Sequence, residues 1–513
     1  MPFFSLSSMK RPLLSSPRTL LLLLLCACVF QLTASGPKRE MRGVWLATVW
    51  GIDWPSVSGT SQKIRQKQQD ELRALLDRCE AANLTSVFFQ VRGMADVMYE
   101  SHLEPWSSFV SGKRGVSPGW DPLKFAVEEC HRRGLECYAW VNPFRWSSGT
   151  DYNSAPDRRW KENGWLLSYG KYTVFNPGLE AVRQHVVDIC REIADNYEID
   201  GLVFDDYFYP NRIPENESAA DYSLWQSEAP WMSFGDWRRA NVHKTVADVS
   251  AMLADSHPGV RFGISPAGIA GKNHTSAPKW GMSGCEVRGD DWQYSEIYSD
   301  PLGWLYQGTV DFISPQIYWT TTHAIAPYEP LARWWSEAAN LYGRHFYASI
   351  TLAPLDKRNT GEERRELLRQ VDANRSLSLD GDQGTVLYSA KHLHKLAPDL
   401  MKSHFALKAL TPEVRHRAVG AVEPPADLRL KGGVLSWHDS AEPAGPRRYA
   451  VYAFPKGLPQ DELMEENGDG IRACYLLGVV YGREMHVGKS ASLTYAVTAL
   501  DGYSTESEAV YLK

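Results

Sequence analysis

The segment from Gly201 to Pro210 reads GLVFDDYFYP, a short apolar run that ends in two adjacent carboxylates and an aromatic cluster. A bounded apolar run of this length is typical of a buried β-strand. Similar runs recur on both sides of it. Together the runs occupy residues 42–48, 86–91, 136–141, 201–205, 261–265, 312–315, 346–350 and 385–388.

Longer amphipathic stretches separate these runs and have the apolar spacing of helices. The clearest are residues 64–82, 122–133, 179–197, 236–255, 330–341 and 362–373. Strands that alternate with helices predict a parallel sheet in the α/β class. Eight such units, with no glycine-rich phosphate loop, favour a (β/α)8 TIM barrel over an open doubly wound sheet.

The pattern changes after the eighth strand. A helical stretch at 391–408 is followed by the hinge-like sequence Glu423-Pro424-Pro425. Short alternating runs then predict a small all-β sandwich. These runs are residues 428–430, 434–437, 449–454, 476–480 and 493–500. The expected parts of the chain are a signal peptide, the barrel and the sandwich, at residues 1–35, 39–410 and 424–513.

The N-terminus has the layout of a secretory signal, with basic residues before the apolar run 20–25 and small residues after it. The sequence LCAC at 25–28 resembles a bacterial lipobox, in which Cys28 is lipidated. The alternative is cleavage near Ala34 and release. A transmembrane helix is disfavoured because the run is shorter than the roughly 20 residues that span a bilayer. We therefore expect an exported protein, periplasmic or a lipoprotein of the outer membrane or cell surface.

The composition argues against a nucleic-acid partner, because 55 basic and 61 acidic residues give a formal net charge of only −6. The chain is instead rich in rings that can stack on sugars, with 19 Trp and 24 Tyr. The expected partner is a polysaccharide, with membrane contact only through the lipid anchor. Neither a Gly-x-Ser-x-Gly elbow nor a metal-binding spacing of histidines is present, so no metal and no cofactor are predicted.

Polar residues gather where the predicted strands end, which is where barrel enzymes build their active sites. The sharpest feature is Asp205-Asp206, our candidate catalytic pair. Adjacent residues of an extended backbone point to opposite sides, so the two acids can hold different pKa values. Glycoside cleavage needs this difference, because one group protonates the leaving oxygen while another stabilises the positive charge at the sugar carbon.

Aromatic and amide side chains at the same edge are candidates for stacking on sugars and for binding hydroxyl or acetamido groups. The expected substrate-binding residues are Trp45, Trp50, Trp54, Gln90, Arg92, Asn142, Arg145, Tyr207, Tyr209, Gln316, Tyr318 and Trp319. For Arg92 and Arg145 two interpretations stay open. Each either pairs with Asp205 or a substrate carboxylate, or forms an internal ion pair at the barrel mouth.

The second reacting group is not evident, because no Glu ends the fifth strand. Acids in the loops that remain candidates are Asp96, Glu100, Glu104, Asp290 and Asp291. Alternatively the substrate supplies the nucleophile, with the adjacent acids orienting a 2-acetamido group. That alternative requires an N-acetylated amino sugar.

Several motifs occur in an order that resembles the glycosyl-hydrolase-like 10 family. They are MRGVW at 41–45, DWP at 53–55, FQVR at 89–92, EPWS at 104–107, WVNP at 140–143, FDDYFYP at 204–210, FGISP at 262–266 and SPQIYW at 314–319. The resemblance implies a (β/α)8 barrel, exported or lipid-anchored, with the Asp pair in the active site. It also implies a glycosidase acting on peptidoglycan strands stripped of peptides, or on another polysaccharide. A carbohydrate-binding barrel without catalysis is the alternative.

The C-terminal region has a resemblance of its own. Its features are the Pro-Pro pair, Trp437 in an early strand, Tyr449-Ala450-Val451-Tyr452 and the late run 495–499. Together they resemble a fibronectin type III module. An unrelated β-domain is the alternative.

Overall fold

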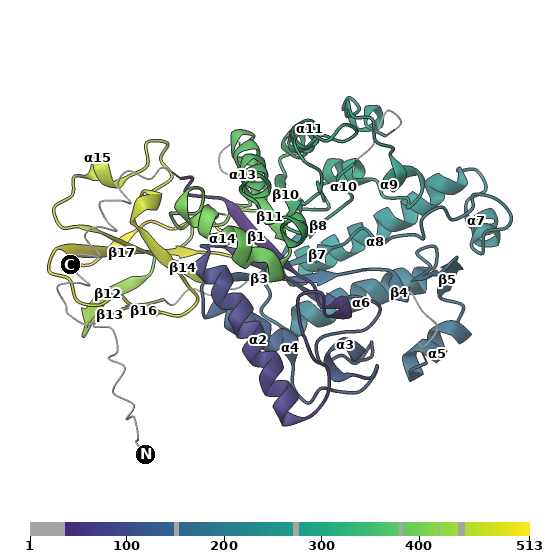
Figure 1. The fold of residues 1–513 in the computed structure, drawn as a ribbon, viewed down its shortest axis with the longest axis horizontal. Helices are drawn as coiled ribbons and strands as arrows, with labels where there is room; N and C mark the ends of the chain where they lie inside the picture. The colour runs from purple at the N-terminus through teal and green to yellow at the C-terminus, as the bar shows by residue number, and fades with distance from the viewer. Residues whose placement is uncertain (1–35, 148–152, 270–275, 379–382, 419, 440–446) are drawn as a thin grey trace, which may run out of the picture.

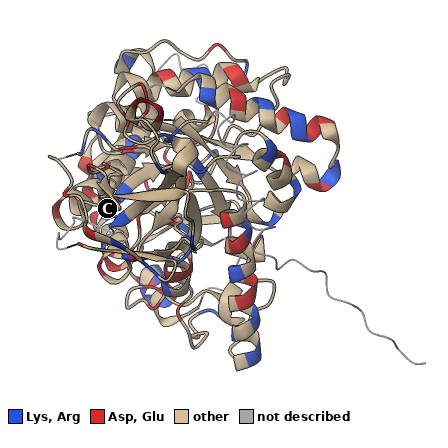
Figure 2. Cartoon of the chain, turned by 90° about the vertical axis from the view of Figure 1, so that its left-hand side faces the viewer, with Lys and Arg blue, Asp and Glu red and all other residues tan. Residues whose placement is uncertain are grey.

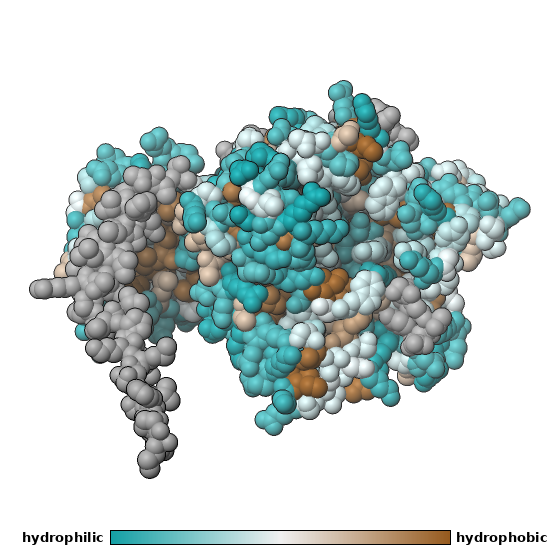
Figure 3. Space-filling model, viewed as in Figure 1, coloured by the Kyte–Doolittle hydropathy of each residue, from teal (hydrophilic) through white to brown (hydrophobic). Residues whose placement is uncertain are grey.

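The computed structural model describes residues 36–147, 153–269, 276–378, 383–418, 420–439 and 447–513. The predicted signal peptide, residues 1–35, and the predicted lipidation site Cys28 lie outside the described residues. In the described part, no helix is long and apolar enough to cross a membrane. The space-filling view shows a mostly hydrophilic face with small apolar patches (Figure 3).

Eight parallel strands close into a barrel in the order β1-β11-β10-β9-β8-β7-β3-β2. Their bounds are β1 Met41–Leu46, β2 Ser86–Arg92, β3 Glu136–Val141, β7 Gly201–Phe204, β8 Arg261–Ile264, β9 Phe312–Ile313, β10 His345–Thr351 and β11 Gln383–Tyr388. The predicted (β/α)8 barrel is therefore confirmed, and all eight predicted strands are present.

Helices surround the barrel (Figure 1). The longer ones are α2 Gln62–Ala81, α4 Pro122–His131, α6 Glu180–Asn196, α8 Phe234–Ser256, α11 Tyr328–Leu341, α13 Gly361–Ser376 and α14 Leu393–Lys402. Shorter ones are α3 Ser108–Ser111, α5 Ala155–Glu162, α7 Tyr222–Glu228, α9 Trp292–Ser295, α10 Pro301–Gln307 and α12 Pro354–Lys357. One further short helix, α15 Gln460–Leu463, belongs to the C-terminal region (Figure 1). Side-chain caps fix several starts. Ser61 accepts from Ile64 N before α2, and Asp121 accepts from Lys124 N before α4. Basic and acidic residues are interspersed along the outer helices (Figure 2).

The inside of the barrel is filled by aromatic rings. Phe88 and Tyr138 stack with centroids 4.6 Å apart, and Trp45 lies 4.8 Å from Phe88. Gly263 makes room for this packing, because a Cβ there would lie 2.3 Å from the ring of Phe312. A barrel filled in this way has no pore, so a ligand can enter only at its ends.

A three-stranded antiparallel sheet, in the order β4-β6-β5, is inserted between β3 and α6. Its strands are β4 Arg145–Ser147, β5 Leu166–Tyr169 and β6 Tyr172–Phe175. This sheet was not predicted from the sequence. It lies at the end of the barrel that faces away from the C-terminal sheets (Figure 1).

The C-terminal region is all-β, as predicted, with one three-stranded sheet, β12-β13-β16, and one four-stranded sheet, β15-β14-β17-β18. The strands are β12 Ala426–Lys431, β13 Val434–His438, β14 Arg448–Pro455, β15 Leu476–Val480, β16 Glu484–His486, β17 Leu493–Leu500 and β18 Val510–Tyr511. Five of these seven were predicted. The two missed strands, β16 and β18, have only 3 and 2 residues, too few for a visible alternation.

Buried charges join the C-terminal sheets to the amino ends of the barrel strands. Glu136, at the start of β3, pairs with Arg261 of β8 at 2.5 Å and with Arg448 of β14. Thr411 also donates to the Glu136 carboxylate. Because a buried carboxylate with two partners is costly to separate, the two parts are held together by more than a linker.

All six cysteines after the signal region are unpaired thiols. Five are buried and Cys474 is half-buried. Burial raises the pKa of Cys79 to about 12, so this thiol stays protonated and behaves as a small apolar side chain.

Candidate active site

A cavity of about 250 Å³ opens at the carboxyl ends of the barrel strands. It is lined by Trp45, Ala47, Val49, Trp50, Ile52, Gln90, Trp140, Arg145, Asp205, Tyr207, Ser265, Gln316, Tyr318 and Tyr388. Eight of the fourteen predicted site residues are therefore brought together here: Trp45, Trp50, Gln90, Arg145, Asp205, Tyr207, Gln316 and Tyr318. Asp206 is half-buried and directly adjoins this set.

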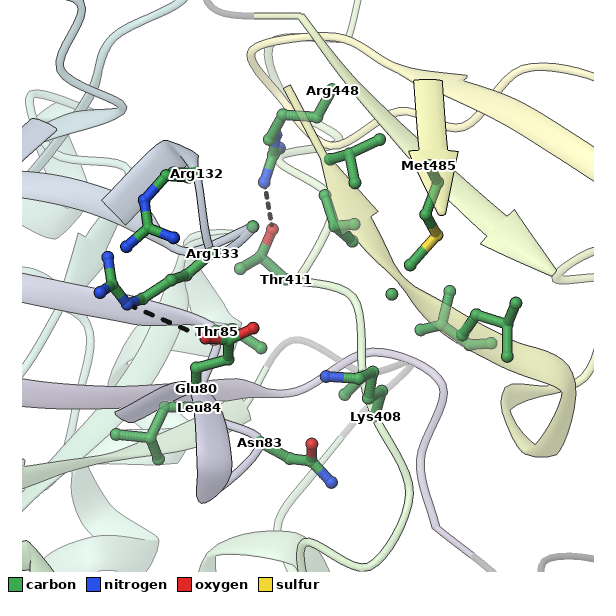
Figure 4. A pocket seen from close by; sticks show the side chains of 17 residues that line it. Glu80, Asn83, Leu84, Thr85, Arg132, Arg133, Lys408, Thr411, Arg448 and Met485 are labelled. Atoms are coloured by element: carbon green, nitrogen blue, oxygen red, sulfur yellow. Dashed lines mark hydrogen bonds and ion pairs between the residues drawn. The ribbon is translucent and has the colours of Figure 1, made fainter. Parts of the chain in front are cut away.

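A second cavity, of about 260 Å³, lies between the barrel and the C-terminal sheets (Figure 4). Arg132, Arg133, Lys408 and Arg448 contribute to its lining, and its one acid, Glu80, is 3.8 Å from Arg133. It is at the amino ends of the strands, an end that serves stability in barrels of this kind. The cavity at the carboxyl ends is therefore the candidate active site.

Asp205 is held in place by three N–H donors. Trp140 Nε1 donates to one carboxylate oxygen at 3.2 Å, and Gln316 Nε2 donates to the other at 3.1 Å. The backbone N–H of Asp206 donates to Asp205 at 2.9 Å. The side chain of Gln316 is itself fixed, because Nε2 also donates to the Ser265 carbonyl. Donors on both oxygens favour the ionised form of Asp205 and fix its plane.

Asp205 and Asp206 titrate as an interacting pair. Burial raises the pKa of Asp205, and hydrogen bonds from Asp206 and Trp140 and the charge of Arg145 counteract that rise. Burial raises the pKa of Asp206 well above its ordinary range, and both the charge of Asp205 and a side-chain hydrogen bond to Asp205 raise it further. Of the two carboxyl groups, Asp206 is therefore the one that takes up a proton first as the pH falls.

The rim of the cavity is cationic and aromatic. The Arg145 guanidinium lies 4.4 Å from the ring centroid of Tyr207 and 5.1 Å from that of Trp50. Trp50 is 56% exposed, which leaves its ring free to stack on a sugar. Opposite, Tyr318 and Tyr388 stack with centroids 5.7 Å apart. Arg145 forms no ion pair with a carboxylate of the described residues, and it lines the cavity, where its charge lowers the pKa of Asp205 and Asp206.

Gln90 and Trp45 shape the cavity from below. The Gln90 side-chain oxygen accepts the N–H groups of Thr48 and Val49, and so holds the turn that carries Trp50. Trp45 Nε1 donates to the Ser349 hydroxyl at 3.0 Å. The Trp45 N–H and the Gln90 side-chain oxygen are both engaged within the protein, which leaves the Trp45 ring as an apolar floor.

Five of the expected substrate-binding residues lie outside the cavity lining: Trp54, Arg92, Asn142, Tyr209 and Trp319. Trp54 is fully buried and donates to the Gln68 carbonyl. Asn142 donates to the Gly93 carbonyl.

The other three pack within the protein. Tyr209 meets Tyr298 edge to face, and Trp319 packs against the core between barrel and helices. Arg92 forms an internal ion pair with Glu104, with two contacts of 2.7 Å, which corresponds to the second interpretation of this residue.

None of the loop acids considered as a second carboxylate lines the cavity. Glu104 is neutralised by Arg92 and hydrogen-bonded to His185. Asp96 lies 3.3 Å from Arg114. The others are Glu100, Asp290 and Asp291, which reach solvent. The described residues also contain no cluster of three or more metal-binding side chains.

Trp140, Ser265 and Tyr388 line the cavity but were not predicted as site residues. Trp140 and Tyr388 belong to the apolar runs of predicted strands, so the sequence indicates core residues at these two positions. Ser265 directly follows a strand, and its position at the carboxyl end was the available signal.

A (β/α)8 barrel with an acidic pair and aromatic rings at the carboxyl ends of its strands has the architecture of barrel glycoside hydrolases. Residues 40–359 match the family model Glycosyl hydrolase-like 10. The chain belongs to that family.

Curated relatives carry related names. Glycosyl hydrolase YngK of Bacillus subtilis is 34% identical over 433 residues, 81% of this chain and 82% of that protein. Glycosyl hydrolase DigH of Escherichia coli K12 is 32% identical over 389 residues, 71% of this chain and 86% of that protein. Among solved structures, the PgaB glycoside hydrolase domain of Bordetella bronchiseptica is similar with a TM-score of 0.46 and 15% identity, covering 73% of this chain and 100% of that one.

Proposed function

We propose that the protein hydrolyses a glycosidic bond in a polysaccharide, with Asp205 and Asp206 as the reacting acids. The observation that carries this proposal is that the surroundings of the two carboxyl groups favour different protonation states. Asp205 is held by N–H donors that favour its charged form, and the pKa of Asp206 is raised well above its ordinary range. A charged group and a proton donor side by side are what glycoside cleavage requires.

We further propose a glycan that contains N-acetylated hexosamines, with peptidoglycan strands as the first candidate. The relatives are named glycosyl hydrolases, which supports the reaction and leaves the glycan open. The exposed ring of Trp50 and the rings of Tyr207 and Tyr318 suit stacking on successive sugars. The N–H groups of Arg145 suit a carboxylate on the glycan.

The test is an assay of wild type, Asp205→Asn and Asp206→Asn on peptide-stripped peptidoglycan strands and on a panel of other polysaccharides. Removing a proton donor is expected to lower the rate about 10²–10⁴-fold. The matched control is Asp290→Asn, an exposed acid outside the cavity, which should retain wild-type activity. Both site variants should still bind the glycan in a sedimentation assay.

The result that would overturn the proposal is a wild-type protein that binds glycan and cleaves no member of the panel. That outcome supports the carbohydrate-binding barrel without catalysis. Anhydro products would instead identify a non-hydrolytic transglycosylase, and they are distinguished from hydrolysis products by mass.

We also propose export and lipid anchoring at Cys28, on the basic, apolar and LCAC pattern of the N-terminus. Expression of the full chain with labelled palmitate should label wild type and leave Cys28→Ser unlabelled. Export with no label in either chain would support cleavage near Ala34 and release.

The C-terminal sheets we propose to be a fibronectin type III-like module. The arrangement of three antiparallel strands and four antiparallel strands over a shared core of Trp437, Tyr449 and Val497 supports this. An experimental structure compared with such modules tests it.

A further inference from the structure

The contact between Asp205 and Asp206 is incompatible with either usual spacing of glycosidase carboxylates. Retaining enzymes hold the two groups about 5–5.5 Å apart, and inverting enzymes about 6.5–9.5 Å apart. Here the two acids are consecutive in the chain, the backbone N–H of Asp206 donates to the Asp205 carboxylate at 2.9 Å, and the two side chains interact directly. They therefore meet on one side of the sugar and cannot flank the scissile bond from opposite faces.

The described lining offers no other acid that could attack from the opposite face. Asp205 is the one carboxylate among the described residues that line the cavity. Glu104 and Asp96 are engaged by Arg92 and Arg114. The nucleophile must therefore come from elsewhere than these acids.

The cavity floor has the properties that an acetamido group needs. Trp45 and Trp140 meet edge to face with centroids 4.9 Å apart, and Ala47 is fully buried beside them. This apolar corner adjoins the Asp205 oxygen that accepts from Trp140. An apolar corner beside a carboxylate suits both halves of an N-acetyl group, because the rings can pack on its methyl group and the carboxylate can accept its amide N–H.

We infer that the nucleophile is the carbonyl oxygen of the substrate's own 2-acetamido group, oriented by Asp205, with Asp206 as the proton donor. This inference rests on the proposed function and specifies the sugar in the reacting position. The acetamido oxygen bonds to the anomeric carbon as the bond from that carbon to the leaving oxygen breaks. The leaving oxygen takes the Asp206 proton, and the product is an oxazolinium ion.

The second step restores the starting state. Water attacks the anomeric carbon, Asp206 takes a proton from that water, and the bond to the acetamido oxygen breaks. The sugar leaves with its original anomeric configuration, because two inversions have occurred at one carbon. Throughout, the negative charge of Asp205 stabilises the positive charge that the acetamido nitrogen acquires.

Trp140 and Gln316 are positioning residues in this scheme. They donate to the two carboxylate oxygens of Asp205 and so fix the plane of that carboxylate. The titratable groups that face the pair are Arg145, Tyr207, Tyr318 and Tyr388, and Arg145 is the one cation among them.

The experiment compares one glycan in several N-acyl forms, with wild-type full-length protein. The forms are the N-acetyl glycan, its de-N-acetylated form with free amines, and that form re-acylated with acetyl or trifluoroacetyl groups. Trifluoroacetyl weakens the attacking oxygen without removing it. We expect re-acetylation to restore cleavage, and trifluoroacetylation and deacetylation each to slow it about 100-fold or more.

Outcomes for the two proposals differ. No cleavage of the N-acetyl glycan contradicts the proposed function itself. Cleavage of all acyl forms at similar rates leaves the glycosidase intact and overturns the inference. Inversion of configuration, read by proton NMR of the first product, also overturns it.

Variants separate the roles of the two acids. Asp206→Asn should recover most of its lost rate on substrates with an acidic aryl leaving group, because those need no proton. Asp205→Asn should not recover on the same substrates. Asp151→Asn tests the one alternative carboxylate from the segment 148–152, which lies outside the described residues, and should retain wild-type rates. Loss of activity in Asp151→Asn with retained folding would overturn the inference.

Discussion

Replacing the acid that neutralises Arg92 is expected to destabilise the protein by several kcal/mol. Arg92 and Glu104 are both fully buried and share two contacts of 2.7 Å. Glu104→Gln keeps the size of the side chain and removes its charge. Breaking a buried ion pair on one side costs about 3–5 kcal/mol, because the remaining charge is left uncompensated.

The pKa of Glu104 gives an independent value of similar magnitude for the loss of folding free energy. Burial alone would raise this pKa, but Arg92 and His185 lower it from 4.5 to about 2. A shift of that size corresponds to about 3 kcal/mol of folding free energy. Because the folded-state pKa is depressed, this stabilisation is present above the unfolded-state pKa and is lost as the pH falls from about 4.5 toward about 2.

The assay is urea unfolding of wild type and Glu104→Gln, followed by tryptophan fluorescence at pH 7 and pH 3. We expect a deficit of about 3 kcal/mol at pH 7 that shrinks at pH 3, where wild type has lost part of its advantage. The control is Glu128→Gln, an exposed acid of α4, which should change the free energy of unfolding by less than about 0.5 kcal/mol.

Two results would refute this reasoning. One is a deficit under about 1 kcal/mol at pH 7, and the other is a deficit that does not shrink on acidification. If Glu104→Gln does not fold, the double variant Arg92→Met with Glu104→Leu still gives an answer. It should be more stable than Arg92→Met alone, since no charge is left unpaired.

Three further predictions concern the cavity. Gln316→Ala removes a hydrogen-bond donor from Asp205, so the pKa of Asp205 should rise. The acidic limb of the pH–activity profile should therefore move to higher pH, and kcat should fall about 10- to 100-fold. A pH–activity profile whose acidic limb does not move would contradict this. Trp50→Ala should raise KM in steady-state kinetics and change the free energy of unfolding by less than about 0.5 kcal/mol; an unchanged KM would count against stacking. Arg145→Met should weaken calorimetric binding of a carboxylate-bearing glycan more than that of the same glycan with its carboxyls reduced, and equal weakening would argue against a carboxylate contact.

The barrel strands could be predicted because each is a local apolar run whose type does not depend on distant partners. The inserted sheet could not. Its strands β5 and β6 have only 4 residues each, and β5 reads Leu-Leu-Ser-Tyr with two exposed positions. Such a segment shows neither a buried run nor a sustained alternation, so its pairing with β4 becomes visible only in three dimensions.

Part of the site could be predicted from the rule that barrel enzymes place their active-site residues at the carboxyl ends of the strands. That rule identified Asp205 and Gln316, which the structure joins across 111 positions of sequence. It does not tell which way a side chain turns at a strand end. Arg92 points away from the cavity to Glu104, and Glu104 in turn meets His185, 81 positions along the chain. Burial and ion pairing across such distances leave no local pattern.

The buried charges between the barrel and the C-terminal sheets bear on how the gene can be recombined. A C-terminal domain, or tail, that is joined by a linker alone can be exchanged between proteins without changes to the rest of the chain. Here a new tail would have to supply a cation for Glu136, and it would have to fit against Gly134, where a Cβ would lie 2.0 Å from the Val479 carbonyl oxygen. Barrel and tail of this chain are therefore expected to be inherited together, and a chimaera has to carry both sides of that contact.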